Sequence, residues 1–183
     1  MAVAMAEGRP ADGTGLEVRV TTAKGRSVFA RRPYSQGETV VTSRRVSTTT
    51  ERSVRSIQYD DQVHIYMDEP ALLLNHACDP NTGIANNEKE SFNFIALRDI
   101  DAGEEITWDY ETTEWDLVGI FDCQCEATQC RGQLRGFPSL DQALVHSYGA
   151  YIADYIKRFL AREEGSRESG AASLPATAVP PAG

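Results

Sequence analysis

The chain has no run of about 18 apolar residues, the length that a helix needs to cross a bilayer, so we expect no membrane span. Its first residues, MAVAMAEGRPADG, have neither a basic start nor a long apolar stretch, so they do not resemble a secretion signal. Basic residues are also scarce, since 18 Lys and Arg stand against 27 Asp and Glu for a net charge of −9. Sequence-independent binding of nucleic acid needs clustered cations, so we expect no direct contact with nucleic acid.

These absences also bear on partners and location. An acidic protein suits basic partners such as a lysine-rich peptide, although acidity that only aids solubility is an equally good interpretation. We expect an intracellular monomer, cytoplasmic, or nuclear if the source is eukaryotic, with no membrane partner. In a reducing compartment, clustered cysteines are more often metal ligands than disulfides.

The composition is that of one globular domain with irregular ends. Hydrophobic residues make up 41% and charged residues 25% of the 183 residues. Residues 1–14 and 165–183 are rich in small or polar residues, so we expect a disordered N-terminus and a disordered tail.

Alternating apolar and polar residues predict a mainly β fold of short strands. The strands are expected at Leu16–Val20, Glu38–Thr42, Val63–Met67, Phe92–Ala96 and Glu105–Trp108. Residues 30–40 align without gaps on residues 96–106, sharing Ala, Arg, Gly and Glu, and each copy has a glycine turn. We therefore predict a pseudo-symmetric β unit, with two copies of a common turn as the alternative.

The pattern becomes helical over residues 137–164. Ser139 precedes Gln142 by three residues, the spacing of a capping box, and apolar residues then recur at helical spacing as far as Phe159. Gly149 is a point at which this stretch could divide into two helices. We expect the apolar face to pack on the β domain.

All four cysteines of the chain suit one metal site: Cys78, Cys123, Cys125 and Cys130. Zinc binds four thiolates in a tetrahedron, and a C-x-C-x4-C segment lets one loop supply three of them. Two cysteines one residue apart are too close for a comfortable disulfide, yet both can reach one metal. We predict one structural zinc ion, with four free thiols as the alternative.

Three further patterns surround these cysteines. They are N-H-A-C-D-P-N at 75–81, G-E-E-I-T-W-D-Y at 103–110, and the cysteine segment that ends in C-R-G at 130–132. In this order they resemble the N-H-x-C-x-P-N, G-E-E-L-T-[FY]-D-Y and post-SET motifs of the SET-domain protein lysine methyltransferases. Residues 24–30, K-G-R-S-V-F-A, are similar to the glycine-bearing motif that opens that domain.

This resemblance implies a β-clip-like SET domain at 15–112, a post-SET zinc segment at 113–136 and a C-terminal helix or helix pair. It implies a protein-lysine N-methyltransferase that uses S-adenosylmethionine on a protein or peptide substrate, histone tails included. The alternative is a catalytically silent SET module that binds a protein partner.

The resemblance also implies roles for single residues. Tyr110 matches the catalytic tyrosine. Tyr59, Tyr66 and Trp108 are candidates for the walls of the lysine channel, although strand packing is the commoner fate of Tyr59 and Tyr66. The implied cofactor-binding residues are Lys24, Gly25, Arg26, Ser27, Asn75, His76, Tyr110 and Leu134. We expect zinc removal to free the segment from about Cys123 to Leu134 and so to abolish activity indirectly.

Three positions depart from the family pattern. Ser27 stands where the second glycine of a G-x-G motif is usual, and a positive φ there would make serine costly. Leu72 stands where an arginine is frequent, so the expected ion-pair partner of Glu105 is missing. Trp108 replaces the usual Phe or Tyr, and we expect a mono- or dimethyl-lysine product.

Overall fold

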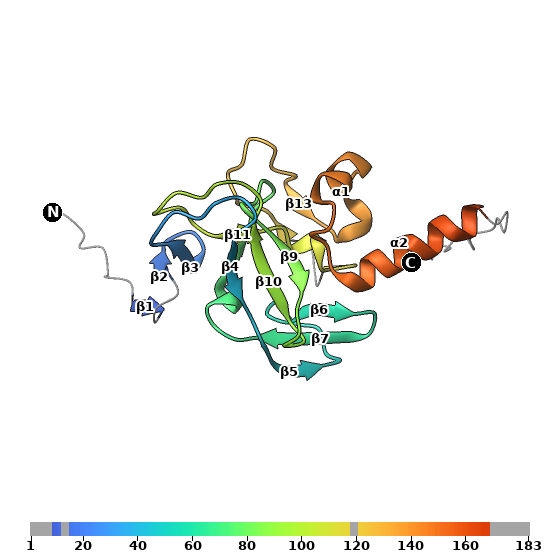
Figure 1. The fold of residues 1–183 in the computed structure, drawn as a ribbon, viewed down its shortest axis with the longest axis horizontal. Helices are drawn as coiled ribbons and strands as arrows, with labels where there is room; N and C mark the ends of the chain where they lie inside the picture. The colour runs from blue at the N-terminus through green and yellow to red at the C-terminus, as the bar shows by residue number, and fades with distance from the viewer. Residues whose placement is uncertain (1–8, 12–14, 118–120, 169–183) are drawn as a thin grey trace, which may run out of the picture.

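The computed structural model of the chain describes residues 9–11, 15–117 and 121–168. Its strands are short and form several small sheets, and its α-helices both lie at the C-terminal end (Figure 1). The predicted mainly β fold class is therefore confirmed. Among the described residues, none of the helices combines the length and the apolar character that a bilayer span requires.

Three sheets have three strands each, and every pairing in them is antiparallel. The first has the order β1 (Arg9–Ala11), β2 (Leu16–Thr21), β3 (Gly25–Ala30). The second places β10 (Phe92–Ala96) between β4 (Thr39–Thr42) and β9 (Thr82–Asn86). The third places β7 (Val63–Met67) between β5 (Arg45–Thr49) and β6 (Ile57–Asp60).

Two smaller ladders and the helices complete the fold. β8 (Asn75–His76) pairs in parallel with β11 (Thr107–Trp108), and β12 (Phe121–Asp122) pairs with β13 (Gln133–Leu134). Short 3-10 helices span Ala71–Leu73, Tyr110–Thr112 and Phe137–Ser139. The α-helices are α1 (Gln142–Tyr148) and α2 (Asp154–Glu168).

Each predicted strand is present, with small changes at the ends. The first extends one residue to Thr21, and the last begins at Thr107 and not at Glu105.

At the termini the expectation of disorder is wrong for two pieces. Arg9–Ala11 pairs with β2, and α2 continues to Glu168, because pairing and helix propagation stabilise backbone that composition alone marks as loop. Residues 1–8, 12–14 and 169–183 lie outside the described part of the chain.

The two similar segments pair with each other about a local twofold axis. Tyr34 and Ile100, at equivalent positions, each donate an N–H to the carbonyl of the other at 2.9 Å. The glycine turns are related in the same way. Gly37 and Gly103 both have positive φ, and the N–H of each donates to the carbonyl of the first residue of the opposite copy. The ion pairs Arg32–Glu38 and Arg98–Glu104 are duplicated as well. These reciprocal contacts confirm the predicted pseudo-symmetric unit.

The C-terminal stretch is a helix pair, but its start differs from the prediction. The N-cap of α1 is Asp141, whose carboxylate accepts the N–H of Leu144 at 2.8 Å. Ser139 instead belongs to the preceding 3-10 helix, where its hydroxyl lies 2.9 Å from the buried carboxylate of Glu111 and 2.8 Å from the carbonyl of Gly136. Gly149, with φ 54°, ends α1 as predicted.

The helices pack on the β domain and share its core. Buried residues of this part include Leu140, Tyr148, Ile152, Ala153, Tyr155 and Ile156. The contact with β9 is close, because a Cβ at Gly83 would lie 2.6 Å from the Cβ of Tyr151. The predicted apolar face therefore completes the core.

Candidate active site

The parallel pairing of β8 with β11 brings the two longest motifs together. Thr107 lies opposite Asn75, and Trp108 lies opposite His76. The chain then leaves β11 through Asp109 and enters the 3-10 helix that begins with Tyr110. Residues from two separate sequence motifs thus lie side by side at one point of the fold.

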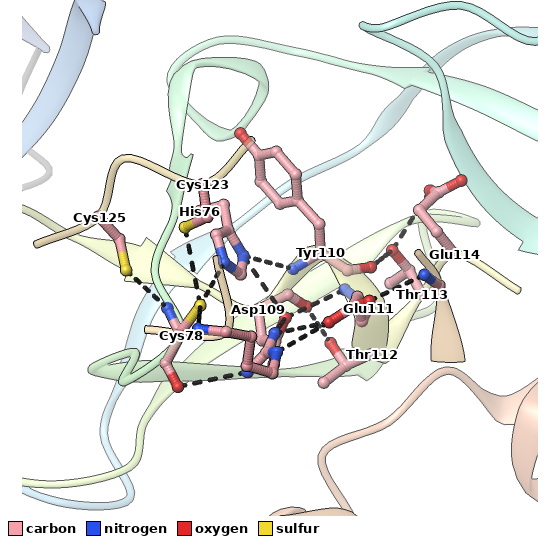
Figure 2. Close-up of polar contacts among 12 residues, drawn as sticks. His76, Cys78, Asp109, Tyr110, Glu111, Thr112, Thr113, Glu114, Cys123 and Cys125 are labelled. Carbon is pink, nitrogen blue, oxygen red and sulfur yellow. Dashed lines mark hydrogen bonds and ion pairs between the residues drawn. The ribbon is translucent and has the colours of Figure 1, made fainter. Parts of the chain in front are cut away.

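Tyr110 is held on both its backbone and its side chain, and Figure 2 shows the backbone contact with His76. Its N–H donates to Nδ1 of His76 at 3.2 Å, and its hydroxyl donates to the carbonyl of Leu74 at 3.1 Å. Its ring packs against Trp108, with ring centroids 5.0 Å apart. Burial raises the pKa of this phenol above its ordinary value, so the hydroxyl keeps its proton at neutral pH.

Two cavities meet at Tyr110. One, of about 340 Å³, is also lined by Lys24, Asn75, His76 and the segment 122–125. The other, of about 80 Å³, is lined by residues 53–57, Trp108 and Glu114 among others. Among the described residues, only Tyr110 lines both. The larger of the two has the size of a small-molecule site.

A polar network supports the larger cavity. The side-chain amide of Asn75 donates to the hydroxyl of Ser27 and to the carboxylate of Glu105, both at 2.8 Å. Ser27 lies in regular strand without a positive φ, unlike Gly25, whose φ is 73°. The expected strain at Ser27 is therefore absent. The ammonium of Lys24 lies 2.9 Å from Glu105 and is the ion-pair partner that Leu72 does not provide.

Some residues predicted for the site lie elsewhere. Gly25, Arg26 and Ser27 do not line the 340 Å³ cavity, and Arg26 forms an exposed ion pair with Glu69 at 2.9 Å. Leu134 is buried in β13 but also does not line that cavity. Tyr66 lines neither cavity, and its hydroxyl lies 3.2 Å from that of Ser53.

The four cysteines form the predicted cluster. Their sulfur atoms all lie within 4.8 Å of one another, and those of Cys78 and Cys123 are 3.7 Å apart. Four thiolates about 2.3 Å from one zinc ion would lie about 3.8 Å apart, so the arrangement fits a tetrahedral site. Backbone N–H groups of Cys78 and Arg131 donate to the cluster sulfurs at 3.4 Å, which favours the thiolate form. The donor set therefore suits one zinc ion with no open position.

His76 connects this cluster with Tyr110. Its Nδ1 accepts the N–H of Tyr110, so the ring proton resides on Nε2, which lies 3.3 Å from the sulfur of Cys78. Burial, with Arg131 and Lys24 nearby, lowers the pKa of His76 to about 3. The ring is therefore neutral at physiological pH.

Two buried carboxylates beside Tyr110 were not predicted. Asp109 and Glu111 flank the tyrosine, and the guanidinium of Arg131 lies 2.7 Å from an oxygen of each. The hydroxyl of Tyr148 donates to Asp109 at 2.8 Å. The available signal was the D-Y-E order around Tyr110 together with the arginine after the last cysteine.

Glu114 is a further buried carboxylate, and it lines the 80 Å³ cavity. One of its oxygens accepts the backbone N–H of Gln58 at 2.8 Å, and burial raises its pKa to about 7. A third cavity, of about 780 Å³, lies between the third sheet and α2, and none of the predicted site residues lines it.

Comparison with known proteins shows which family the central part of the chain resembles. Residues 25–111 match the family described as SET domain. The chain is 25% identical over 115 residues to the methyltransferase flvH of Aspergillus flavus, covering 62% of each chain. It is 37% identical over 75 residues to the histone-lysine N-methyltransferase Set2 of Drosophila melanogaster, covering 38% of this chain and 3% of the relative. Residues 25–111 are therefore similar to the SET domain of lysine methyltransferases, and the chain spans less than two thirds of each of these relatives.

Solved structures show the same fold. The methyltransferase domain of human histone-lysine N-methyltransferase SETMAR matches with a TM-score of 0.52 and 17% identity, over 66% of this chain and 58% of that one. KRYPTONITE in complex with mCHG DNA and SAH matches with a TM-score of 0.50 and 23% identity, over 64% of this chain and 28% of that one. At these identities the likeness concerns the fold alone.

Proposed function

We propose that the protein is an S-adenosylmethionine-dependent protein-lysine N-methyltransferase. The observation that carries this proposal is the position of Tyr110, which lines both cavities. Methyl transfer from one bound molecule to another requires that two sites meet where the reacting atoms are aligned. The 340 Å³ cavity is the proposed cofactor site, and the 80 Å³ cavity is the proposed lysine site.

The residues of the larger cavity suit the cofactor. S-adenosylmethionine, when bound, supplies the methyl group. Asn75 is held by Ser27 and Glu105, so its amide enters the cavity in a fixed orientation, and neutral His76 lies next to it. KRYPTONITE, whose fold is similar, is in complex with SAH, which supports a cofactor of this class for the chain.

The smaller cavity suits a lysine side chain that must react as a neutral amine. A free lysine has a pKa near 10.4, so roughly 0.04% is neutral at pH 7. Burial beside Trp108 and Leu74 would lower that pKa, because it disfavours the ammonium. The hydroxyl of Tyr110 donates to Leu74, which leaves its oxygen lone pairs to accept an N–H from the amine and orient it.

The proposed substrate is a lysine in a protein or peptide, with a histone tail as one candidate. Relatives that are named histone-lysine N-methyltransferases support this, as does the acidic net charge of the chain. We propose an intracellular location, cytoplasmic or nuclear, because a zinc site of four thiolates needs reduced cysteines.

A silent SET module that only binds a protein partner is the second proposal. It predicts that the protein binds no S-adenosylmethionine, whereas the enzyme proposal predicts binding with a 1:1 stoichiometry. Isothermal titration with the cofactor separates the two. The contacts that hold Asn75 and Tyr110 favour the enzyme.

The direct test is Tyr110→Phe. With labelled cofactor and cell extract, this variant should transfer methyl groups at least about tenfold more slowly, because one oriented hydrogen bond is worth about 1.4 kcal/mol. Its folding, zinc content and affinity for S-adenosylhomocysteine should match the native protein. Tyr59→Phe is the control, since Tyr59 packs on Phe92 and lines neither cavity. Equal turnover by native protein and Tyr110→Phe would remove Tyr110 from the mechanism.

A further inference from the structure

The three residues Asp109, Tyr110 and Glu111 point in two directions. The ring of Tyr110 extends towards the cavities, while the carboxylates of Asp109 and Glu111 lie on its other side (Figure 2). Both carboxylates are at most 1% exposed, which is a costly place for two negative charges. Their partners therefore show which parts of the chain must be in place around Tyr110.

Arg131 is the cation that faces both carboxylates. Its guanidinium lies 2.7 Å from Asp109 and 2.7 Å from Glu111. A second nitrogen, Nε, donates to Glu111 at 2.9 Å. A guanidinium keeps its charge at physiological pH, so both carboxylates face a cation.

The carboxylate oxygens of Asp109 and Glu111 also accept hydrogen bonds from the part of the chain that follows Arg131. Glu111 accepts the backbone N–H groups of Arg135 and Gly136 at 2.7 and 2.8 Å and the hydroxyl of Ser139. Asp109 accepts the hydroxyl of Tyr148, a residue of α1. Arg131, Arg135, Gly136, Ser139 and Tyr148 are thus tied to the carboxylates on either side of Tyr110 by these contacts, none of which involves a cysteine, although the backbone N–H of Arg131 also donates to Cys78.

We propose that Asp109, Glu111, Arg131 and Tyr148 form a clasp that fixes Tyr110 between the two cavities without help from the metal. Arg131 and Tyr148 are then positioning residues for methyl transfer, a role that rests on the proposed function. The clasp also shortens the segment that zinc removal is expected to release. The segment 121–130 is released, but residues 131–139 stay docked, so the release ends before Leu134.

Hydrogen–deuterium exchange tests the clasp independently of activity. In native protein treated with a zinc chelator, the amide of Cys123, which donates to Gly132 at 2.7 Å, should lose protection. The amides of Arg135 and Gly136 should keep theirs. Exchange of all three at the same rate after chelation would show that the metal alone holds the segment, and it would overturn the proposal.

Substitutions test the positioning role. In Tyr148→Phe the buried ring remains and only the hydroxyl is lost, so kcat should fall about fivefold to tenfold while KM for the cofactor and the zinc content stay unchanged. Tyr151→Phe is the matched control, because the Tyr151 side chain packs over Gly83 and does not contact Asp109. Arg131→Lys should have an intermediate kcat, and Arg131→Met a lower one.

The outcomes separate the clasp from the enzyme proposal. If Tyr148→Phe has the same kcat as the control Tyr151→Phe, the positioning role of Tyr148 is overturned. If the native protein transfers no methyl group to peptide or small amine, the enzyme proposal fails, and the exchange experiment still decides whether the clasp holds without zinc.

Discussion

At the scale of single residues, Ser27 and Lys24 show how two departures from a family pattern are accommodated. Ser27 occupies a strand position with ordinary backbone angles, and its hydroxyl accepts the amide of Asn75. Lys24 takes the place of a missing arginine as the partner of Glu105. Both residues act on the same small network, which holds Asn75 at the proposed cofactor site.

Restoring the usual glycine at position 27 should therefore weaken the site. Ser27→Gly removes one hydrogen bond and adds the entropic cost of a strand glycine, so the free energy of unfolding should fall by about 1–2 kcal/mol. Titration with S-adenosylhomocysteine should show lower affinity. Ser47→Gly, on the exposed face of β5, should cost some stability and leave that affinity unchanged. Tighter binding by Ser27→Gly would contradict this prediction.

Glu114 gives a prediction for pH. Its folded pKa of about 7 lies above the ordinary value of 4.5 because burial favours the neutral acid. Its contribution to stability is full below about pH 4.5 and is lost as the pH rises through 7, by up to about 3 kcal/mol. Glu114→Gln should remove this loss, so its stability relative to the native protein should increase between pH 5 and 8. Urea denaturation across that range tests the prediction, and parallel curves would refute it.

At the scale of elements, the start of α1 depends on a choice between two side chains. Asp141 caps the helix, whereas the hydroxyl of Ser139 binds Glu111. A capping box needs the Ser139 hydroxyl oxygen to accept an N–H of the helix, but Ser139 ends the preceding 3-10 helix and its hydroxyl faces Glu111 and Gly136.

A double-mutant cycle distinguishes the two roles. Asp141→Ala should lower the free energy of unfolding by about 1 kcal/mol, the usual value of an N-cap. Ser139→Ala should show coupling of at least about 0.5 kcal/mol with Glu111→Gln, and Asp141→Ala should show none. Urea denaturation of the single and double variants provides the energies. Coupling of Asp141 and not of Ser139 to Glu111 would show that the assignment of the cap is wrong.

At the scale of the whole molecule, the helix pair is part of the domain although it lies beyond residues 25–111. It covers β9 and supplies buried side chains to the one core. The 3-10 helix at Phe137–Ser139 and helix α1 also hold the two carboxylates beside Tyr110.

A chain that ends at Gly136 should therefore fail to fold cooperatively. It lacks buried residues of α1, α2 and their connection, such as Tyr148, Ile152 and Ile156, each worth about 1.5–3 kcal/mol of burial, against a typical domain stability of 5–15 kcal/mol. Thermal denaturation followed by circular dichroism should show no sharp transition. A chain that ends at Glu168 should melt like the native protein. A cooperative transition in the shorter chain would show that the helix pair is an independent addition.

Much of the fold and site could be predicted from the sequence by itself. Strand alternation, helical spacing and the glycine at 149 act through neighbours along the chain, so local patterns revealed β7, β10 and the helix pair. The four cysteines and the order of the motifs identified the metal cluster and the position of Tyr110, because each motif carries its chemistry in adjacent residues.

Only the tertiary structure decided which distant groups face one another. The ion pairs of Arg131 with Asp109 and Glu111, and the hydroxyl of Tyr148 on Asp109, join segments that no local pattern connects. Likewise, it showed that Tyr66 and Leu134 line neither cavity. Burial determines these outcomes, because a charge removed from water requires a partner, and the fold alone determines which partner is within reach.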